Sequence, residues 1–426
     1  MEGIQCSPDP GRSSTSSPTV SVATLQLFTH ANYGDDLLSQ ATRYAFEAFS
    51  GEPAGPKGRL FRWEAGFDSR YTVTPTIVSA MNRHDLQLIP GGGLFIPRNE
   101  DISGWAVRIA RQQLSQLHSV IVFSVGYNTY PNLDSFGPVF KDNLDALMDR
   151  TFFLGCRDLG TLDALSSLVT PRVAKKLFFQ PCPTTILDHL VDTGEVKTPE
   201  AGDTARQVCF NIQPRAGIDN EQYFSQVLAA MAHLRSMGYV PVLATLFDRT
   251  DRAFVDYCLE KDFAAPVVTI HHEGSDPLIG PKVFQHMPIV VAARGHSAMV
   301  AWGAASLVIP IDTSVKMEYF TDQYLRRVVG YPDTLLRPDD PDLAQAIVRA
   351  VKVLDEGKAA LREETARTRQ EYALITLDNL SRIYHHSTGR VPRTPSFARL
   401  SEYEAFLIAK WHHAQTLLEG KTRLKP

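Results

Sequence analysis

Three side chains that favour anions lie close together in one stretch of the chain: Arg294, His296 and Lys316. Arg294 and His296 directly follow an apolar run over 288–293, which is typical of a buried parallel strand. Ser297 is a favourable N-cap for the helix that should follow, and a helix N-terminus adds partial positive charge to such a turn. We therefore expect a site for a small, strongly anionic ligand, in which arginine clamps the anion and lysine adds a point charge.

Two further polar motifs occupy comparable positions earlier in the chain. Arg157 and Asp158 end the apolar run 151–156, where such a pair is often only a local ion pair. Asn32 and Asp35 belong to an Asn-Tyr-Gly-Asp motif on the first expected turn from strand to helix. A capping aspartate is the simpler interpretation of that motif in isolation, and contact with sugar hydroxyls is the functional one.

A run of three glycines, Gly91, Gly92 and Gly93, follows a short apolar segment and is expected to form a loop after a strand. Consecutive glycines let a backbone approach a ligand closely, and they equally suit a flexible turn. The run matches neither the dinucleotide-binding fingerprint nor the phosphate-binding loop of nucleotide triphosphatases.

These motifs are carried by strands and helices that alternate twice along the chain. The pattern predicts an α/β domain over 20–191 and a second one over 207–341, joined by a charged linker over 192–206. A long helical pattern makes 342–426 a C-terminal helical extension, and 1–19 reads as a disordered lead rich in serine, proline and glycine. Because ligands bind at the carboxyl ends of parallel strands, Lys316, which follows the next strand, can point at the same crevice as Arg294 and His296.

Taken in order, the motifs resemble those of the polysaccharide pyruvyl transferase family. The family has an Asn-x-Gly-Asp turn, three glycines after a strand, an Arg-Asp pair, an Arg-x-His turn and a later lysine. Many members have leucine between the arginine and the histidine, whereas this chain has Gly295. An Asp-Pro that is common in the family is Cys182-Pro183 here, so no carboxylate role is assigned at that point. The resemblance implies a GT-B-like fold, which has two Rossmann-like domains facing a cleft, with C-terminal helices.

The resemblance also implies an activity, the transfer of pyruvate from phosphoenolpyruvate to two hydroxyls of a sugar as a ketal. Arg157, Arg294, Gly295 and Lys316 would then bind the donor. His296 would be the general acid, an imidazolium favoured by nearby anions and titrating near neutral pH. The predicted acceptor-side and backbone contacts complete the list: Asn32, Asp35, Gly91, Gly92 and Gly93. The scheme requires neither a metal nor an organic cofactor.

Composition narrows the classes of partner. The net charge of −4 gives no basic excess, so nucleic acid is not an expected partner. The five cysteines form no Cys-x-x-Cys pair and the adjacent histidines lack metal-binding spacing, which indicates reduced buried thiols and no metal site. No apolar segment approaches the roughly 18 residues of a membrane span, and the N-terminus lacks signal-peptide features. We expect a cytoplasmic enzyme, with peripheral contact at the inner face of the membrane left open.

Two alternatives remain at this level. The first is a glycosyltransferase of the same fold, in which Arg294 and Lys316 hold the diphosphate of a nucleotide sugar. The second is a member that binds glycan without catalysis, against which the complete set of arginine, histidine and lysine argues. The sequence does not identify the acceptor sugar, its linkage or whether it is carried on a lipid.

Overall fold

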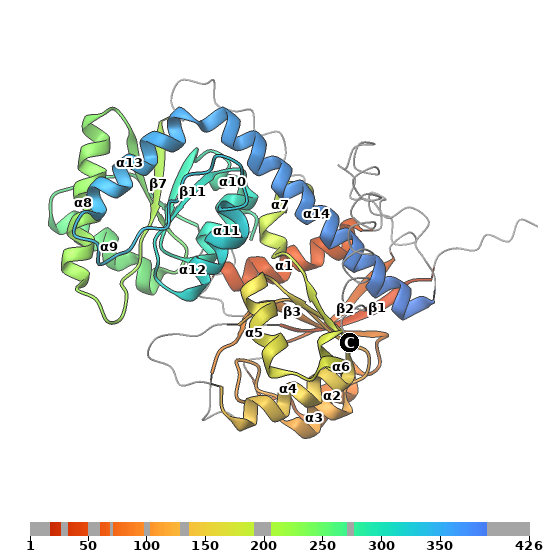
Figure 1. Ribbon diagram of the computed structural model, residues 1–426. Helices are drawn as coiled ribbons and strands as arrows, with labels where there is room; N and C mark the ends of the chain where they lie inside the picture. Colours follow the sequence, from red (N-terminus) through yellow and green to blue (C-terminus); the bar gives the residue numbers. More distant parts are fainter. Residues whose placement is uncertain are drawn as a thin grey trace, which may run out of the picture.

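Two parallel sheets organise the molecule, one in each half of the described chain (Figure 1). The computed structural model describes residues 18–26, 33–49, 60–68, 71–97, 103–127, 136–190, 206–270 and 277–389. The predicted lead over 1–19 and the linker over 192–206 lie almost wholly outside these residues, as does the part of the C-terminal extension after residue 389.

The first sheet has the strand order β2-β1-β3-β4-β5-β6, and all of its pairings are parallel. Its strands are β1 (Val20–Gln26), β2 (Phe61–Asp68), β3 (Leu86–Phe95), β4 (Val120–Tyr127), β5 (Thr151–Cys156) and β6 (Leu177–Phe179). The helices around it are α1 (Tyr33–Ala48), α2 (Pro75–Met81), α3 (Arg111–Gln116), α4 (Pro138–Arg150), α5 (Leu159–Leu168), α6 (Pro171–Ala174), the 3₁₀ turn η1 (Pro183–Thr185) and α7 (Leu187–Leu190). The direction of winding reverses between β1 and β3, so a crevice is expected at their carboxyl ends.

The second sheet has the order β11-β10-β7-β8-β9 and is also parallel throughout its pairings. Its strands are β7 (Gln207–Asn211), β8 (Val240–Thr245), β9 (Val267–Thr269), β10 (Ile289–Ala292) and β11 (Leu307–Pro310). Its helices are α8 (Asn220–Ser236), α9 (Asp248–Glu260), α10 (Ile279–Phe284), α11 (Gly295–Gly303), α12 (Val315–Phe320), a π-helical turn η2 (Thr321–Leu325) and α13 (Leu343–Glu356). Here the winding reverses between β7 and β10, which places the residues after β10 at the ligand-binding edge.

A long helix, α14 (Lys358–Thr388), crosses from the second sheet to the first (Figure 1). Midway along it, buried Arg369 donates to Asp188 of α7 at 2.8 Å and to the carbonyl of Trp302 in α11. Towards its end, Asn379 donates to the carbonyl of Phe179 and Tyr384 donates to the carbonyl of Pro18, both at 2.9 Å. One helix therefore connects both halves.

The two halves also contact each other directly, through glycines. A Cβ on Gly280 of α10 would lie 2.2 Å from the hydroxyl oxygen of Tyr33, and one on Gly303 of α11 would lie 2.0 Å from the carbonyl oxygen of Thr184. The largest apolar cluster correspondingly contains residues of both halves, including Leu37 from the first. The carboxyl edges of the sheets are thus held together by packed side chains.

The glycine run differs from the expected loop. Gly91, Gly92 and Gly93 lie inside β3, which continues to Phe95. A Cβ on Gly91 would lie 1.8 Å from the carbonyl oxygen of Ser124, so β4 approaches here more closely than a side chain permits. Gly92 has φ of 112°, a conformation that favours glycine. The run is a bulged strand rather than a turn, because the neighbouring strand needs that space.

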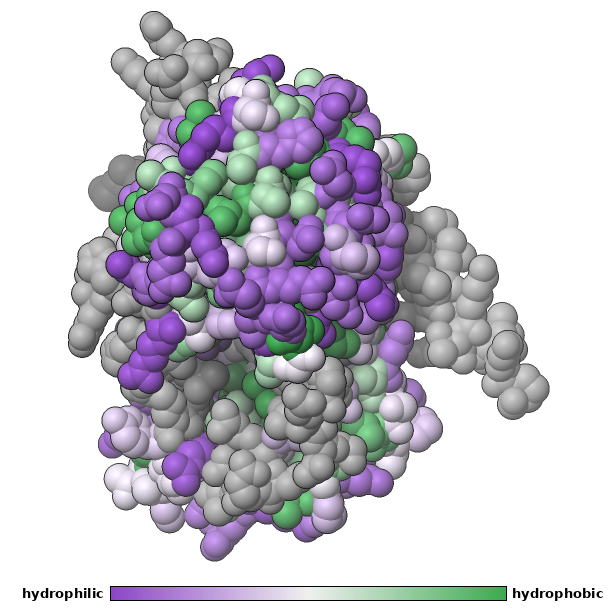
Figure 2. Space-filling view, turned by 90° about the vertical axis from the view of Figure 1, so that its left-hand side faces the viewer, coloured by the Kyte–Doolittle hydropathy of each residue, from purple (hydrophilic) through white to green (hydrophobic). Residues whose placement is uncertain are grey.

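The side of the molecule that carries α8 and α9 is mainly hydrophilic, with apolar residues in small groups (Figure 2). Of the helices that the structure describes, none combines the length and the apolar character needed to cross a bilayer.

Candidate active site

His296 lies at the reversal point of the second sheet, directly after β10. Helix α11 begins at Gly295, and Arg294 occupies its N-cap position with extended backbone. This differs from the prediction that Ser297 is the N-cap, since the helix starts three residues earlier than predicted. Arg294 and His296 consequently stand on either side of the first helical residue, at the end of the helix that carries partial positive charge.

The imidazole of His296 inserts against helix α1 of the other half. A Cβ on Gly34 would lie 1.9 Å from Nδ1 of His296, so only a glycine leaves room for the ring. Nδ1 also lies 3.9 Å from Oδ1 of Asp35. Nε2 is buried and has no hydrogen-bond partner among the residues that the structure describes. One ring nitrogen thus faces a carboxylate, and the other is left for a ligand.

Burial holds the pKa of His296 well below its usual value, and the charges of Arg157, Lys316 and Arg294 lower the pKa further. The imidazole is therefore neutral at pH 7 in the free protein. The predicted imidazolium, which would titrate near neutral pH, concerns the site with its anionic ligand, and it stays a prediction.

Arg294 is held by a carboxylate that the sequence did not single out. Its Nε and Nη2 lie 3.1 and 3.0 Å from Oδ1 of Asp251, and Nη2 also donates to the hydroxyl of Thr250. The other oxygen of Asp251 accepts bonds from Asn211 at 2.9 Å and from the backbone N–H groups of the two residues after β8 at 2.8 and 3.1 Å. Asp251 is fully buried, so this network fixes the guanidinium. An anion would meet Arg294 through Nη1, because Nε and Nη2 already donate to Asp251 and Thr250.

Arg157 follows β5 and is almost fully buried, with 2% of its side chain exposed. A Cβ on Gly126 of β4 would lie 2.4 Å from its Cζ, so the guanidinium rests on the bare backbone of that glycine. Nε lies 3.4 Å from Oδ2 of Asp158, while Oδ1 of Asp158 accepts the N–H of Thr161 and caps α5. The predicted partner Asp158 therefore fixes both the arginine and the helix that follows.

Lys316 reaches the same place from α12. A Cβ on Gly295 would be in ordinary contact with the Cβ of Lys316, at 3.7 Å, so the stem of the lysine runs over the first residue of α11. The ammonium group is one of the three cations that act on His296. The structure thus gathers an imidazole, two guanidinium groups, one ammonium group and the carboxylate of Asp35 from four separate helix or strand ends.

Comparison with known proteins bears on this site. A sequence profile of the polysaccharide pyruvyl transferase family matches residues 32–304, more than half of the chain. The chain belongs to the polysaccharide pyruvyl transferase family. The matched region contains Asp35, Arg157, Arg294 and His296 and ends before Lys316. No curated protein matches the sequence.

Solved structures share the fold at low sequence identity. A putative UDP-N-acetylglucosamine 2-epimerase from Listeria monocytogenes has a TM-score of 0.55 at 11% identity, over 89% of this chain and 100% of that one. A UDP-forming α,α-trehalose-phosphate synthase from Burkholderia xenovorans has a TM-score of 0.52 at 10% identity, over 88% of this chain and 100% of that one. The expected GT-B-like arrangement of two Rossmann-like domains is confirmed.

Of the other expected site residues in this pyruvyl transferase family member, Asn32 is outside the described residues, and Gly91, Gly92 and Gly93 lie in β3. The glycines of β3 pack on the first sheet and on α1, where a Cβ on Gly92 would lie 3.3 Å from a methyl carbon of Leu38. Sequence reasoning missed Asp251 and Gly126. Asp251 follows a strand in a charged segment and looks like an ordinary helix residue, so no signal in a single sequence marks it.

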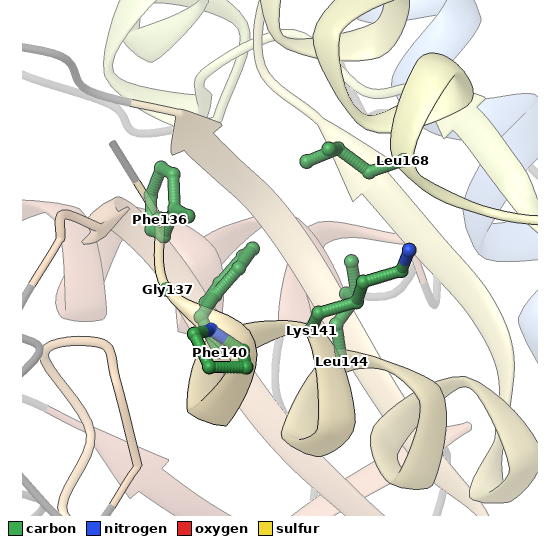
Figure 3. Close-up of a pocket in the computed structure, with 7 residues that line it drawn as sticks. Phe136, Gly137, Phe140, Lys141, Leu144 and Leu168 are labelled. Carbon is green, nitrogen blue, oxygen red and sulfur yellow. The ribbon is translucent and has the colours of Figure 1, made fainter.

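The described residues include no group of three or more histidine, cysteine, aspartate or glutamate side chains placed to hold a metal ion. The four described cysteines are buried and free of disulfides. A separate apolar cavity of about 110 Å³ lies beside α4 (Figure 3). Its charged lining is limited to Lys141 among the described residues, so it does not share the chemistry around His296.

Proposed function

We propose that this family member transfers the pyruvyl group of phosphoenolpyruvate to a sugar of a cell-surface polysaccharide, or of its precursor, as a ketal. The convergence of Arg157, Arg294 and Lys316 on His296 carries the proposal. Phosphoenolpyruvate has a phosphate and a carboxylate, and fixed guanidinium and ammonium groups are the side chains that hold such anions. Membership of the family supplies the class of reaction.

The donor itself would convert His296 to its acid form. In the free protein, burial and three cations hold the imidazole neutral. The anionic groups of phosphoenolpyruvate would offset those cations and raise the pKa of His296. Asp35 stands beside Nδ1 and would stabilise the imidazolium, which leaves the proton on buried Nε2 directed at the donor.

The reaction then follows by acid catalysis. Nε2 of His296 gives its proton to the methylene carbon of phosphoenolpyruvate, and positive charge develops on the neighbouring carbon. One sugar hydroxyl adds there and loses its proton, and phosphate leaves towards the arginines and Lys316. A second hydroxyl adds and loses its proton, which closes the ketal. One of the two hydroxyl protons restores His296, and the other leaves on hydrogen phosphate, so no metal or organic cofactor enters the balance.

Asp35 has a second role in this proposal, because its carboxylate reaches His296 from the first domain. We assign it to the acceptor hydroxyls, with Asn32 as its neighbour in the same motif. The glycines Gly91, Gly92 and Gly93 are assigned to the same side, through the packing of β3 under α1. We place the reaction in the cytoplasm, where phosphoenolpyruvate is made, with a lipid-linked acceptor presented at the inner face of the membrane.

Calorimetric titration of phosphoenolpyruvate into wild type and Arg294→Ala tests the donor. Saturable binding is expected for wild type, and the variant should lose it. Arg111→Ala is the matched control, since Arg111 is an exposed arginine on α3 and should bind as wild type does. If phosphoenolpyruvate gives no heat with or without sugars while one of a panel of nucleotide sugars binds, the glycosyltransferase alternative replaces pyruvyl transfer.

A further inference from the structure

A polar groove of about 300 Å³ lies between helix α1 and the edge strand β2, outside the group of residues around His296. Its lining consists of Ser39, Gln40 and Arg43 on α1 and Trp63, Glu64, Ala65 and Gly66 on β2. Because β2 pairs with β1 alone among the described strands, the groove opens along the rim of the first sheet.

Several polar groups in the groove have no hydrogen-bond partner among the residues that the structure describes. The hydroxyl of Ser39, the amide of Gln40 and the indole N–H of Trp63 make no hydrogen bond to any residue that the structure describes. Arg43 uses Nε for Glu47 at 2.9 Å. Trp63 is kept beside the groove by an edge-to-face contact with Phe46, whose ring centroid is 5.9 Å away.

Glu64 is also fixed in place, by an ion pair with Arg62 at 2.5 Å and by His84 at 3.1 Å. The groove therefore combines an indole with an amide, a hydroxyl, a guanidinium group and a carboxylate. One charge of each sign does not favour a strongly charged ligand. An uncharged sugar fits better, because its C–H face can pack on an indole while its hydroxyls both donate and accept hydrogen bonds.

The groove follows helix α1 from Asp35, the residue of that helix beside His296. Asp35, Ser39 and Arg43 are spaced by four residues on α1 and so share one face of the helix. At about 1.5 Å per residue, Ser39 and Arg43 lie roughly 6 and 12 Å along the axis from Asp35. A chain of linked sugars whose reacting unit meets Asp35 and His296 can therefore extend along α1 into the groove.

We propose that this groove binds a neighbouring, uncharged sugar unit of the acceptor, so that the acceptor is an oligosaccharide or polysaccharide chain. The inference rests on the proposed pyruvyl transfer for its choice of ligand and adds a second binding site to it. A nucleotide-linked monosaccharide would leave the groove empty.

The test uses an array of oligosaccharides of two to six units built from glucose, galactose, mannose and N-acetylhexosamines. Wild type should bind a subset, and calorimetry then measures the dissociation constant of the best one. Trp63→Ala should weaken that binding by about tenfold or more, as for other aromatic anchors. Gln40→Ala is the second variant, because Gln40 is only half-buried and its loss leaves the packing of Trp63 on Phe46 intact. Tyr71→Ala, which removes an exposed aromatic from the same domain, should bind as wild type does.

The proposal is overturned if no oligosaccharide binds, or if binding survives both groove variants unchanged. Phosphoenolpyruvate titrations of the same preparations separate this result from the proposed function. Oligosaccharide binding that depends on Trp63 without any phosphoenolpyruvate binding keeps the groove and rejects the donor. Phosphoenolpyruvate binding without groove-dependent oligosaccharide binding keeps the donor and rejects the groove.

Discussion

Replacing Gly34 by alanine should disable His296 without changing any charged group. The added Cβ would lie 1.9 Å from Nδ1 and 2.1 Å from Cγ of the imidazole. Ordinary contact begins at 3.4 Å, so the ring or the helix must move by about 3.4 − 1.9 = 1.5 Å. Overpacking of this kind costs about 1–3 kcal/mol of folding free energy.

A displacement of this size should matter more for catalysis than for folding. A misplacement of about 1 Å at a reacting group lowers rates by about 100-fold, so kcat/KM for phosphate release should fall by at least that factor. The pKa of His296, followed by NMR in protein with labelled histidine, should rise towards its usual value of about 6.5, because the displaced ring loses its burial. The NMR measurement does not require the acceptor.

Gly303→Ala is the matched control, since its Cβ would lie 2.0 Å from the carbonyl oxygen of Thr184 at another contact between the two halves. It should lower thermal stability comparably and leave the pKa of His296 depressed. The reasoning is refuted if Gly34→Ala turns over at the wild-type rate with the pKa of His296 still depressed. In that case the close packing of α1 on the ring has no catalytic role.

Three further predictions concern charge. Asp251→Asn should destabilise the protein by about 3–5 kcal/mol in chemical denaturation, because Nε and Nη2 of Arg294 lose their carboxylate partner. The same variant should also weaken phosphoenolpyruvate binding. At pH 7, phosphoenolpyruvate binding should take up protons, because the anions raise the depressed pKa of His296; calorimetry in buffers of different ionisation enthalpy should detect the uptake in wild type and lose it in His296→Gln. The pKa of His296 is lower in the folded protein, so its neutral ring stabilises the fold fully above the unfolded pKa of about 6.5, and this contribution is lost as the pH falls. Below that pH, the free energy of unfolding of wild type relative to His296→Gln should decrease by up to about 1.4 kcal/mol per pH unit. An increase instead would contradict the buried, cationic environment assigned to His296.

Much of the architecture is predictable because both sheets are parallel and covered on both faces. Their strands are continuous apolar runs that end abruptly in polar residues, so the sequence alone places Arg157, Arg294 and His296 at strand ends. The prediction of a loop at the three glycines is wrong, because Gly91 has to be a glycine for the sake of the Ser124 carbonyl on the neighbouring strand. The residues around Gly91 in the sequence do not indicate that contact.

The ionic partners and the protonation of the site residues also could not be predicted from a single sequence. Asp251 binds Arg294 across 43 residues, and neither motif indicates the other. The depressed pKa of His296 depends on burial between α1 and α11 and on three cations from different elements. Residue types therefore predicted which groups meet, whereas their protonation and their partners follow from the tertiary arrangement.

The contact of α14 with the first strand has a consequence for biosynthesis. The hydroxyl of Tyr384 bonds to the carbonyl of Pro18, 366 positions earlier, and the ring of Tyr384 packs on Phe49 and Phe61. While the ribosome is still making the second sheet, these two phenylalanines of the first domain are not yet covered by Tyr384. The domain translated first thus reaches its final packing after the domain translated second. We expect the nascent chain to depend on chaperones that shield this aromatic surface until α14 emerges.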